Sequence, residues 1–207
     1  MFCPECRCEF VGWTGKCPNC ETRLVEELPV IPETADQPIA YQALVDLVRE
    51  NGGQLEIDLS TVGVGMERKW SFPYQGYKLA WAKRMRGDFD SSSVDVTTTD
   101  VGKEKKFSFP YQGYGFAWAR KMEGYIGGNP VTLAANKVSR KKIHRFPYRG
   151  YGFAWVQELS GECGDQLRAH LVITDVGKKK GWRFPYSGYG AAWANKGVLT
   201  LTLNEQL

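Results

Sequence analysis

A segment of about 37 residues occurs four times in the C-terminal three quarters of this 207-residue chain. The prolines of a shared Phe-Pro-Tyr motif stand at positions 73, 110, 147 and 185. A repeat of this length corresponds to one supersecondary unit, which cannot bury its apolar face without neighbouring copies. We therefore expect residues 54–207 to form one domain of four similar units, with centres at 70–82, 107–119, 144–156 and 182–194.

The residues within a unit alternate as they do in β-strands. Residues 94–99 are β-branched and alternating, and residues 106–111 place aromatic side chains at every second position. After a Tyr-x-Gly-Tyr turn, Phe116, Trp118 and Met122 alternate with Ala117, Ala119 and Lys121. A period of two is typical of strands with one buried face. The sequence therefore predicts a mainly β fold of three strands per unit, with about twelve strands in all.

The period alone leaves three arrangements open: a closed barrel, a propeller-like ring, or two pairs of units. Closure is attractive because it removes unpaired sheet edges. The second and fourth units share Thr-Asp-Val-Gly, at 99–102 and 174–177. This likeness favours an alternating two-plus-two arrangement.

A linker and a helix are expected between the N-terminal segment and the repeats. Residues 28–38 contain three prolines, which favour an extended chain. Residues 39–53 have apolar side chains at helical spacing and end in Asn-Gly-Gly, a sequence that suits a left-handed cap. We expect this amphipathic helix to pack on the sheet, with insertion into a nucleic-acid groove as the alternative.

Four of the six cysteines form two Cys-Pro-x-Cys pairs: Cys3 with Cys6, and Cys17 with Cys20. Two such turns can direct four thiolates at one tetrahedral ion and leave no open coordination position, which is typical of a structural site. Ligand softness and a reducing compartment favour one structural Zn²⁺. Rubredoxin-like iron would use the same four sulfurs, and two disulfides are a further alternative.

Residues 1–27, from Met-Phe-Cys-Pro-Glu-Cys through Leu-Val-Glu, resemble the short zinc ribbons found at the start of many prokaryotic proteins. The resemblance implies a metal-stabilised knob that contacts nucleic acid or other proteins and carries out no reaction. Cys8 lies outside the two pairs and is expected to be a spare exposed thiol. Cys163 is expected to be a buried structural thiol.

Composition excludes two classes of protein. An apolar fraction of 43% and an aromatic fraction of 13% are too high for a disordered chain. No stretch approaches the roughly 20 apolar residues of a membrane-spanning helix, and Cys3 stands where a secretory signal would have its basic and apolar regions. We therefore expect a cytoplasmic protein without membrane contacts.

The chain offers few groups for catalysis. His144 and His170 are its two histidines, and His144 occupies a position where the other units have Trp or Phe. The sequence contains no nucleophile elbow, phosphate loop or dinucleotide fingerprint. We therefore expect a protein that binds something and is not an enzyme.

Each repeat centre contributes a Phe, two Tyr and a Trp at fixed positions. The Phe and Trp side chains are expected to form the core. The tyrosines flank a glycine turn, and turns usually lie at the surface. The best candidates for a repeated contact surface are therefore Tyr74, Tyr111, Tyr148 and Tyr186, or their partners Tyr77, Tyr114, Tyr151 and Tyr189.

Positive charge is concentrated in the repeats. Residues 1–53 contain 4 Lys and Arg against 9 Asp and Glu, a net charge of −5, whereas residues 54–207 contain 23 against 14, a net charge of +9. A basic cluster precedes each aromatic block, and the candidate ligand-binding residues in these clusters are Lys105, Lys106, Lys141, Lys142, Lys179, Lys180 and Arg183.

Basic groups beside exposed rings suit a single-stranded nucleic acid, because lysines neutralise phosphates while bases stack on the rings. The sequence therefore favours nucleic-acid binding by charge and stacking. A scaffold for protein partners or for homo-oligomerisation is the main alternative, and a carbohydrate-binding repeat that uses the same rings is the third.

Overall fold

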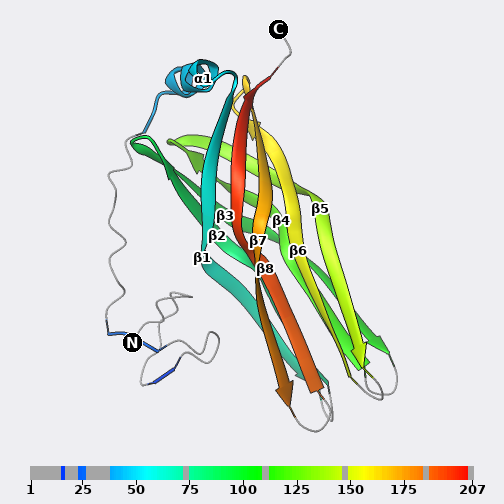
Figure 1. The fold of residues 1–207 in the computed structure, drawn as a ribbon. Helices are drawn as coiled ribbons and strands as arrows, with labels where there is room; N and C mark the ends of the chain where they lie inside the picture. The colour runs from blue at the N-terminus through cyan, green and yellow to red at the C-terminus, as the bar shows by residue number, and fades with distance from the viewer. Residues whose placement is uncertain are drawn as a thin grey trace.

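The computed structural model describes residues 15–16, 23–26, 38–71, 75–108, 112–145, 149–183 and 187–204, and near the ends of the strands next to its gaps it describes the backbone alone. One helix, α1 (Tyr41–Glu50), is followed by eight strands that form a closed antiparallel barrel in chain order (Figure 1). The strands are β1 (Gln54–Ser71), β2 (Gln75–Phe89), β3 (Ser92–Ser108), β4 (Gln112–Ile126), β5 (Asn129–Arg145), β6 (Arg149–Cys163), β7 (Leu167–Arg183) and β8 (Ser187–Leu203).

Consecutive strands form four long hairpins, and each hairpin contains one copy of the sequence motif. We number them from the first (β1–β2) to the fourth (β7–β8). The prediction of three strands per unit is wrong, because residues 94–99 and 106–108 belong to the single strand β3. The closed barrel is confirmed among the three arrangements, and the two-plus-two alternative is wrong because hydrogen bonding continues around the whole ring.

The barrel has two different halves. Within the second hairpin, β3 and β4 pair from Val94↔Ile126 to Ser108↔Gln112. Neighbouring hairpins pair over a much shorter stretch, such as Arg84↔Thr97 to Phe89↔Ser92 between β2 and β3. Hydrogen bonds therefore close the barrel only in the half that carries α1. In the other half the hairpins continue as four two-stranded extensions, here called the arms (residues 63–82, 100–119, 137–156 and 175–194; Figure 1).

Each arm begins at a register shift in the pairing of its hairpin, at Gly63, Asp100, Lys137 and Asp175. Such bulges increase the local twist and bend the strand. Two threonine hydroxyls bridge neighbouring hairpins at this level: Thr61 Oγ1 donates to the carbonyl of Ala194 at 2.6 Å, and Thr98 Oγ1 donates to that of Ala82 at 2.5 Å. Where the strand pairing between hairpins ends, side-chain hydroxyls thus donate hydrogen bonds to backbone carbonyl groups of the neighbouring hairpin.

Helix α1 covers the closed end of the barrel. Leu44, Val45 and Val48 are fully buried and belong to the same core as the inward side chains of the strands. The hydroxyl of Tyr41 accepts a hydrogen bond from the backbone N–H of Gln166 at 2.8 Å and donates one to the carbonyl of Cys163 at 3.0 Å. The predicted helix and its packing role are confirmed. No helix in the described residues is long and apolar enough to cross a membrane.

Cys163 is a core residue, as predicted. Its side chain is fully buried beside α1, and burial raises the pKa of the thiol to about 11. A thiol with so high a pKa is a poor nucleophile at neutral pH, because the thiolate is the reactive form. The role of Cys163 is therefore packing.

Three glycines mark the places where the even-numbered strands bend into the closed barrel. A Cβ atom added to Gly87, Gly124 or Gly161 would lie 1.8–2.0 Å from the backbone oxygen of Asp58, Asp95 or Thr132, respectively. No side chain fits at that distance, and backbone cannot be displaced cheaply. Glycine in a strand interior often marks such a close approach, and here it allows two strands of one hairpin to coil tightly around the core.

We expect Gly124→Ala to destabilise the protein by about 3 kcal/mol, because the new methyl group would overlap the carbonyl oxygen of Asp95. Urea denaturation measures the change. The matched control is Gly63→Ala, whose Cβ would meet its nearest heavy atom, Lys83 Cβ, at 3.9 Å. We expect the control to change stability by less than about 0.5 kcal/mol. Equal losses in the two variants would contradict the steric argument.

Candidate functional site

The structure brings the predicted basic residues to equivalent levels of the arms. Lys105, Lys142 and Lys180 are equivalent in β3, β5 and β7, opposite Gly115, Gly152 and Gly190 of their partner strands. Lys141 and Lys179 come one residue before this level, and Lys106 and Arg183 come after it. Of these residues only Lys141 has a described side chain, and for the others the backbone alone is described. The odd-numbered strands therefore carry four basic segments that run in parallel toward the end of the molecule opposite α1.

The predicted turn tyrosines and metal ligands lie outside the described residues. These are Tyr74, Tyr111, Tyr148 and Tyr186, and Cys3, Cys6, Cys17 and Cys20. The alternative tyrosines Tyr77, Tyr114, Tyr151 and Tyr189 are within the strands and not in turns, since β2, β4, β6 and β8 begin two residues before them. The chain therefore reverses earlier than the Tyr-x-Gly-Tyr pattern suggested.

Each arm packs one face against the next arm. Leu79 and Trp81 of the first hairpin cluster with Ala117 and Val101 of the second. Phe153 and Trp155 of the third hairpin cluster in the same way with Ala192 and Val176 of the fourth. The arms thus meet head to tail around the axis, with Phe153 buried and the Trp rings half-buried. The Phe residues shared by all four units, which the sequence also predicts to lie in the core, are outside the described residues: Phe72, Phe109, Phe146 and Phe184.

Each of three Trp rings also covers a glycine of its own hairpin. A Cβ atom added to Gly65, Gly102 or Gly177 would lie 2.3 Å from the indole of Trp81, Trp118 or Trp193. The strand register places these glycines directly opposite the tryptophans, and Ser139 holds the corresponding position opposite Trp155. The indole therefore lies flat on its own hairpin in at least three arms.

A cation from the following hairpin lies over the Trp ring of three hairpins. The Nζ atom of Lys103 is 5.6 Å from the ring centroid of Trp81, and that of Lys178 is 5.5 Å from Trp155. The guanidinium carbon of Arg140 is 5.1 Å from the centroid of Trp118. Such contacts contribute about 0.5–1 kcal/mol at exposed sites. The fourth equivalent position, facing the hairpin of Trp193, is held by Met66.

Sequence analysis did not identify these cation–π contacts. Their signal is the spacing of Lys103, Arg140 and Lys178, which stand 37 and 38 residues apart on the same side of each basic cluster. The sequence does not show that these cations contact the preceding hairpin, because that contact depends on the order and direction in which the hairpins pack in the ring. Two of the three cations also form ion pairs: Lys103 Nζ with Glu67 Oε2 at 2.5 Å, and Arg140 Nε with Glu104 Oε2 at 3.4 Å.

Charge is unevenly divided among the hairpins. The sequence of the first two, residues 54–89 and 92–126, contains 11 Lys and Arg against 8 Asp and Glu, a net charge of +3. The last two, residues 129–163 and 167–203, contain 12 against 3, a net charge of +9. Most of the excess positive charge of the barrel therefore belongs to the third and fourth hairpins.

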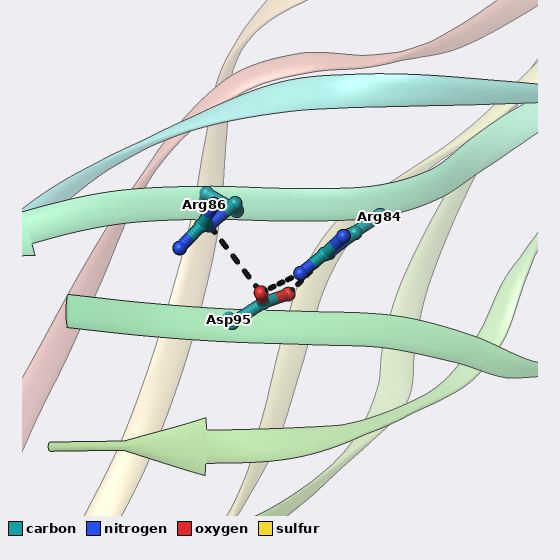
Figure 2. A network of polar contacts seen from close by, with 3 residues as sticks. All are labelled: Arg84, Arg86 and Asp95. Atoms are coloured by element: carbon teal, nitrogen blue, oxygen red, sulfur yellow. Dashed lines mark hydrogen bonds and ion pairs between the residues drawn. The ribbon is translucent and has the colours of Figure 1, made fainter. Parts of the chain in front are cut away.

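A cleft of about 530 Å³ lies on the closed half, between Pro38 and the strands β3 and β4. Asp95 lines it and is held between two guanidinium groups of β2 (Figure 2). Arg84 Nε donates to Asp95 Oδ1 at 2.6 Å and Arg84 also bonds to Oδ2, while Arg86 Nε lies 3.3 Å from Oδ2. These bonds raise the pKa of the Arg84 guanidinium, against a smaller effect of burial.

The Arg84–Asp95 pair crosses from the first hairpin to the second, where strand pairing between hairpins is short. The network therefore serves to join β2 to β3, and we assign no chemical step to the cleft.

The described part of the N-terminal segment contains two short stretches that pair with each other. Lys16 and Arg23 form an antiparallel bridge, and the backbone N–H of Leu24 donates to the carbonyl of Gly15 at 2.8 Å. The described residues on either side of 17–22 therefore lie side by side. Cys17 and Cys20 belong to the intervening residues, which lie outside the described part of the chain. Among the described residues no group of three or more His, Cys, Asp or Glu could hold a metal ion.

Comparisons with protein-family models, with curated proteins and with solved structures found no match to this chain. A functional assignment therefore depends on the geometry and charge of the chain itself.

We expect Arg140→Met to reduce the free energy of unfolding by about 1 kcal/mol, since it removes both the contact with Trp118 and the ion pair with Glu104. Methionine keeps an apolar cover over the ring, as Met66 does in sequence at the equivalent position. The control is Arg120→Met, which removes an exposed ion pair with Asp100 and no ring contact. Urea denaturation of both variants should show a loss below about 0.5 kcal/mol for the control.

Proposed function

We propose that this protein is a non-enzymatic nucleic-acid-binding protein, in which the basic arms neutralise phosphates and aromatic rings at the ends of the arms stack on bases. The observation that carries the proposal is the charge of the third and fourth hairpins, 12 Lys and Arg against 3 Asp and Glu. A field of one sign attracts a polyanion, and phosphate neutralisation supplies most of sequence-independent binding.

The packing of α1 argues against reading of base edges in a groove. The apolar side chains of this helix are buried in the end of the barrel, and its exposed side carries the ion pair between Asp46 and Arg49. The helix is also at the end of the molecule opposite the basic arms (Figure 1). Contacts to the phosphate backbone therefore explain binding better than direct base readout.

The half-buried tryptophans are poor candidates for base stacking. In the described arms a Trp ring is covered by its own hairpin on one side and contacted by the next hairpin on the other. Stacking is therefore assigned to the tyrosines Tyr74, Tyr111, Tyr148 and Tyr186, as the sequence predicts. Base–aromatic stacking contributes about 1–3 kcal/mol per base and tolerates any sequence.

The N-terminal segment is proposed to be a zinc ribbon that holds one structural Zn²⁺ through Cys3, Cys6, Cys17 and Cys20. The spacing of the two Cys-Pro-x-Cys pairs supports this proposal, and so does the pairing of Lys16 with Arg23 on either side of residues 17–22. A bound zinc ion would supply folding free energy to a segment too short to bury a core of its own. The ribbon would then add a second contact module for nucleic acid or for a protein partner.

We expect a fluorescein-labelled single-stranded oligonucleotide to bind with an affinity that falls steeply with salt. For about six phosphate contacts, the logarithm of the association constant should fall with a slope of about 4 against the logarithm of salt concentration. Fluorescence anisotropy measures this slope. Replacing Lys105 and Lys106 by Gln should reduce it by about 1.4. The control Lys121→Gln, in the closed half, should leave it almost unchanged.

The same preparation separates the alternatives. A salt-tolerant oligomer or a co-purifying protein, detected by size-exclusion light scattering, together with no oligonucleotide binding, would favour the scaffold. Glycan binding that persists at high salt would favour a carbohydrate-binding repeat. No association with single- or double-stranded DNA or RNA at low ionic strength contradicts the proposed function.

We expect purified full-length protein to contain one zinc ion per chain by elemental analysis. Cys17→Ser should abolish stoichiometric zinc, because a structural site needs all four ligands. Cys8→Ser is the matched control and should retain it. Iron in place of zinc, or undiminished zinc in the Cys17 variant, would show that the ligand assignment is wrong.

A further inference from the structure

We infer that the principal phosphate-binding site is the seam between the third and fourth hairpins, with Lys141 and Lys178 as its paired ligands; the inference rests on the proposed nucleic-acid binding. A seam is defined here as the line along which one arm faces the next. The site would bind the phosphodiester backbone of a nucleic acid.

Two contacts between neighbouring hairpins fix the direction in which the side chains face. Lys103 of the second hairpin lies over Trp81 of the first, so its position faces the preceding arm. Glu104, the next residue, pairs with Arg140 of the third hairpin and so faces the following arm. Successive residues of a strand point to opposite sides. Each seam is therefore formed by the residue at the position equivalent to Glu104 in one arm and the residue at the position equivalent to Lys103 in the next arm.

In the first two seams these facing residues neutralise each other. Glu67 pairs with Lys103 at 2.5 Å between the first and second hairpins, and Glu104 pairs with Arg140 between the second and third. Lys103 and Arg140 therefore already have an anionic partner in the neighbouring arm. A phosphate that approached either seam would have to compete with a carboxylate.

The seam between the third and fourth hairpins differs in this one respect. At the position equivalent to Glu104 the third hairpin has Lys141, which faces the fourth arm. Lys178 of that arm lies over Trp155. Both lysines are exposed, and within the described residues neither forms an ion pair. Asp175, the acid of the fourth hairpin, accepts a hydrogen bond from Asn195 at 2.7 Å, and this bond lowers the pKa of Asp175 more than the charges of Lys196 and Lys178 do.

Two like charges that face each other across a gap repel, and the repulsion is relieved by an anion bound between them. The half-buried ring of Trp155 lies below Lys178 and limits how far its ammonium group can retreat. The third and fourth arms thus present the ammonium groups of Lys141 and Lys178 to the same seam, where the two groups could bind two oxygens of one phosphate. The fourth seam supplies Met66 where the others have Lys or Arg, so it lacks one of the two cations.

The test reverses the charge of the residue at position 141 in the third seam and at position 104 in the second seam. Lys141→Glu would give the third seam the acid–base pair found in the first two. Glu104→Lys would give the second seam the two facing cations of the third. The control is Arg168→Glu, which makes the same change in net charge at an exposed position of β7 in the closed half.

In oligonucleotide anisotropy with the full chain at low salt, Lys141→Glu should weaken binding by at least tenfold and lower the salt slope by about 1.4, the loss of two phosphate contacts. Glu104→Lys should strengthen binding and raise the slope by a similar amount. Arg168→Glu should change affinity less than threefold. Circular dichroism confirms that each variant retains the β fold.

Two results would overturn the inference, and they are distinguishable. If Lys141→Glu and Arg168→Glu weaken binding equally, the site is wrong although the protein binds nucleic acid, because only net charge then matters. If the unaltered protein binds no oligonucleotide, the proposed function fails and this site fails with it.

Discussion

The arms depend on side-chain packing between hairpins, because the backbone hydrogen bonds that close the barrel stop where each arm begins. A two-stranded hairpin is at best marginally stable alone in water. Beyond Gly63, Asp100, Lys137 and Asp175 each arm is such a ribbon, and only its neighbours can stabilise it. The half-buried tryptophans provide that contact. The indoles of Trp81, Trp118 and Trp193 lie on glycines of their own hairpins, and a cation of the next hairpin contacts Trp81, Trp118 and Trp155.

This packing has a direction, which explains why four hairpins can close a ring. One face of an arm presents a large residue and a Trp, and the other face presents a small alanine and a valine, as Leu79 and Trp81 meet Ala117 and Val101. Faces of two kinds join head to tail, and the last joins the first. The hydroxyls of Thr61 and Thr98 follow the same direction, each donating to the preceding hairpin in the ring.

The sequence predicts the β class, the helix and the aromatic core, but neither the number of strands nor the seams. Gly102 and the charged residues around it resemble a loop, whereas in the structure β3 continues through them because Trp118 covers the glycine. The period of two is also interrupted by the bulge at Asp100, so residues 94–99 and 106–111 suggest separate strands. The partner of Lys103 lies in another hairpin, and periodicity within one unit cannot identify it.

The position of Lys141 connects the packing to the proposed function. In the first two seams the same position is an acid that pairs with the cation above a Trp ring, which shows that the geometry accommodates a stabilising ion pair. A lysine there gives up that pair and adds repulsion with Lys178, so the isolated fold gains nothing from it. Exposed ion pairs contribute at most about 1 kcal/mol, and the stability given up is correspondingly small. At low salt, two phosphate contacts, each of which releases a counterion, contribute more binding free energy than the stability lost with the ion pair. The charge pattern is therefore unfavourable for the protein alone and favourable for the protein with a polyanion bound.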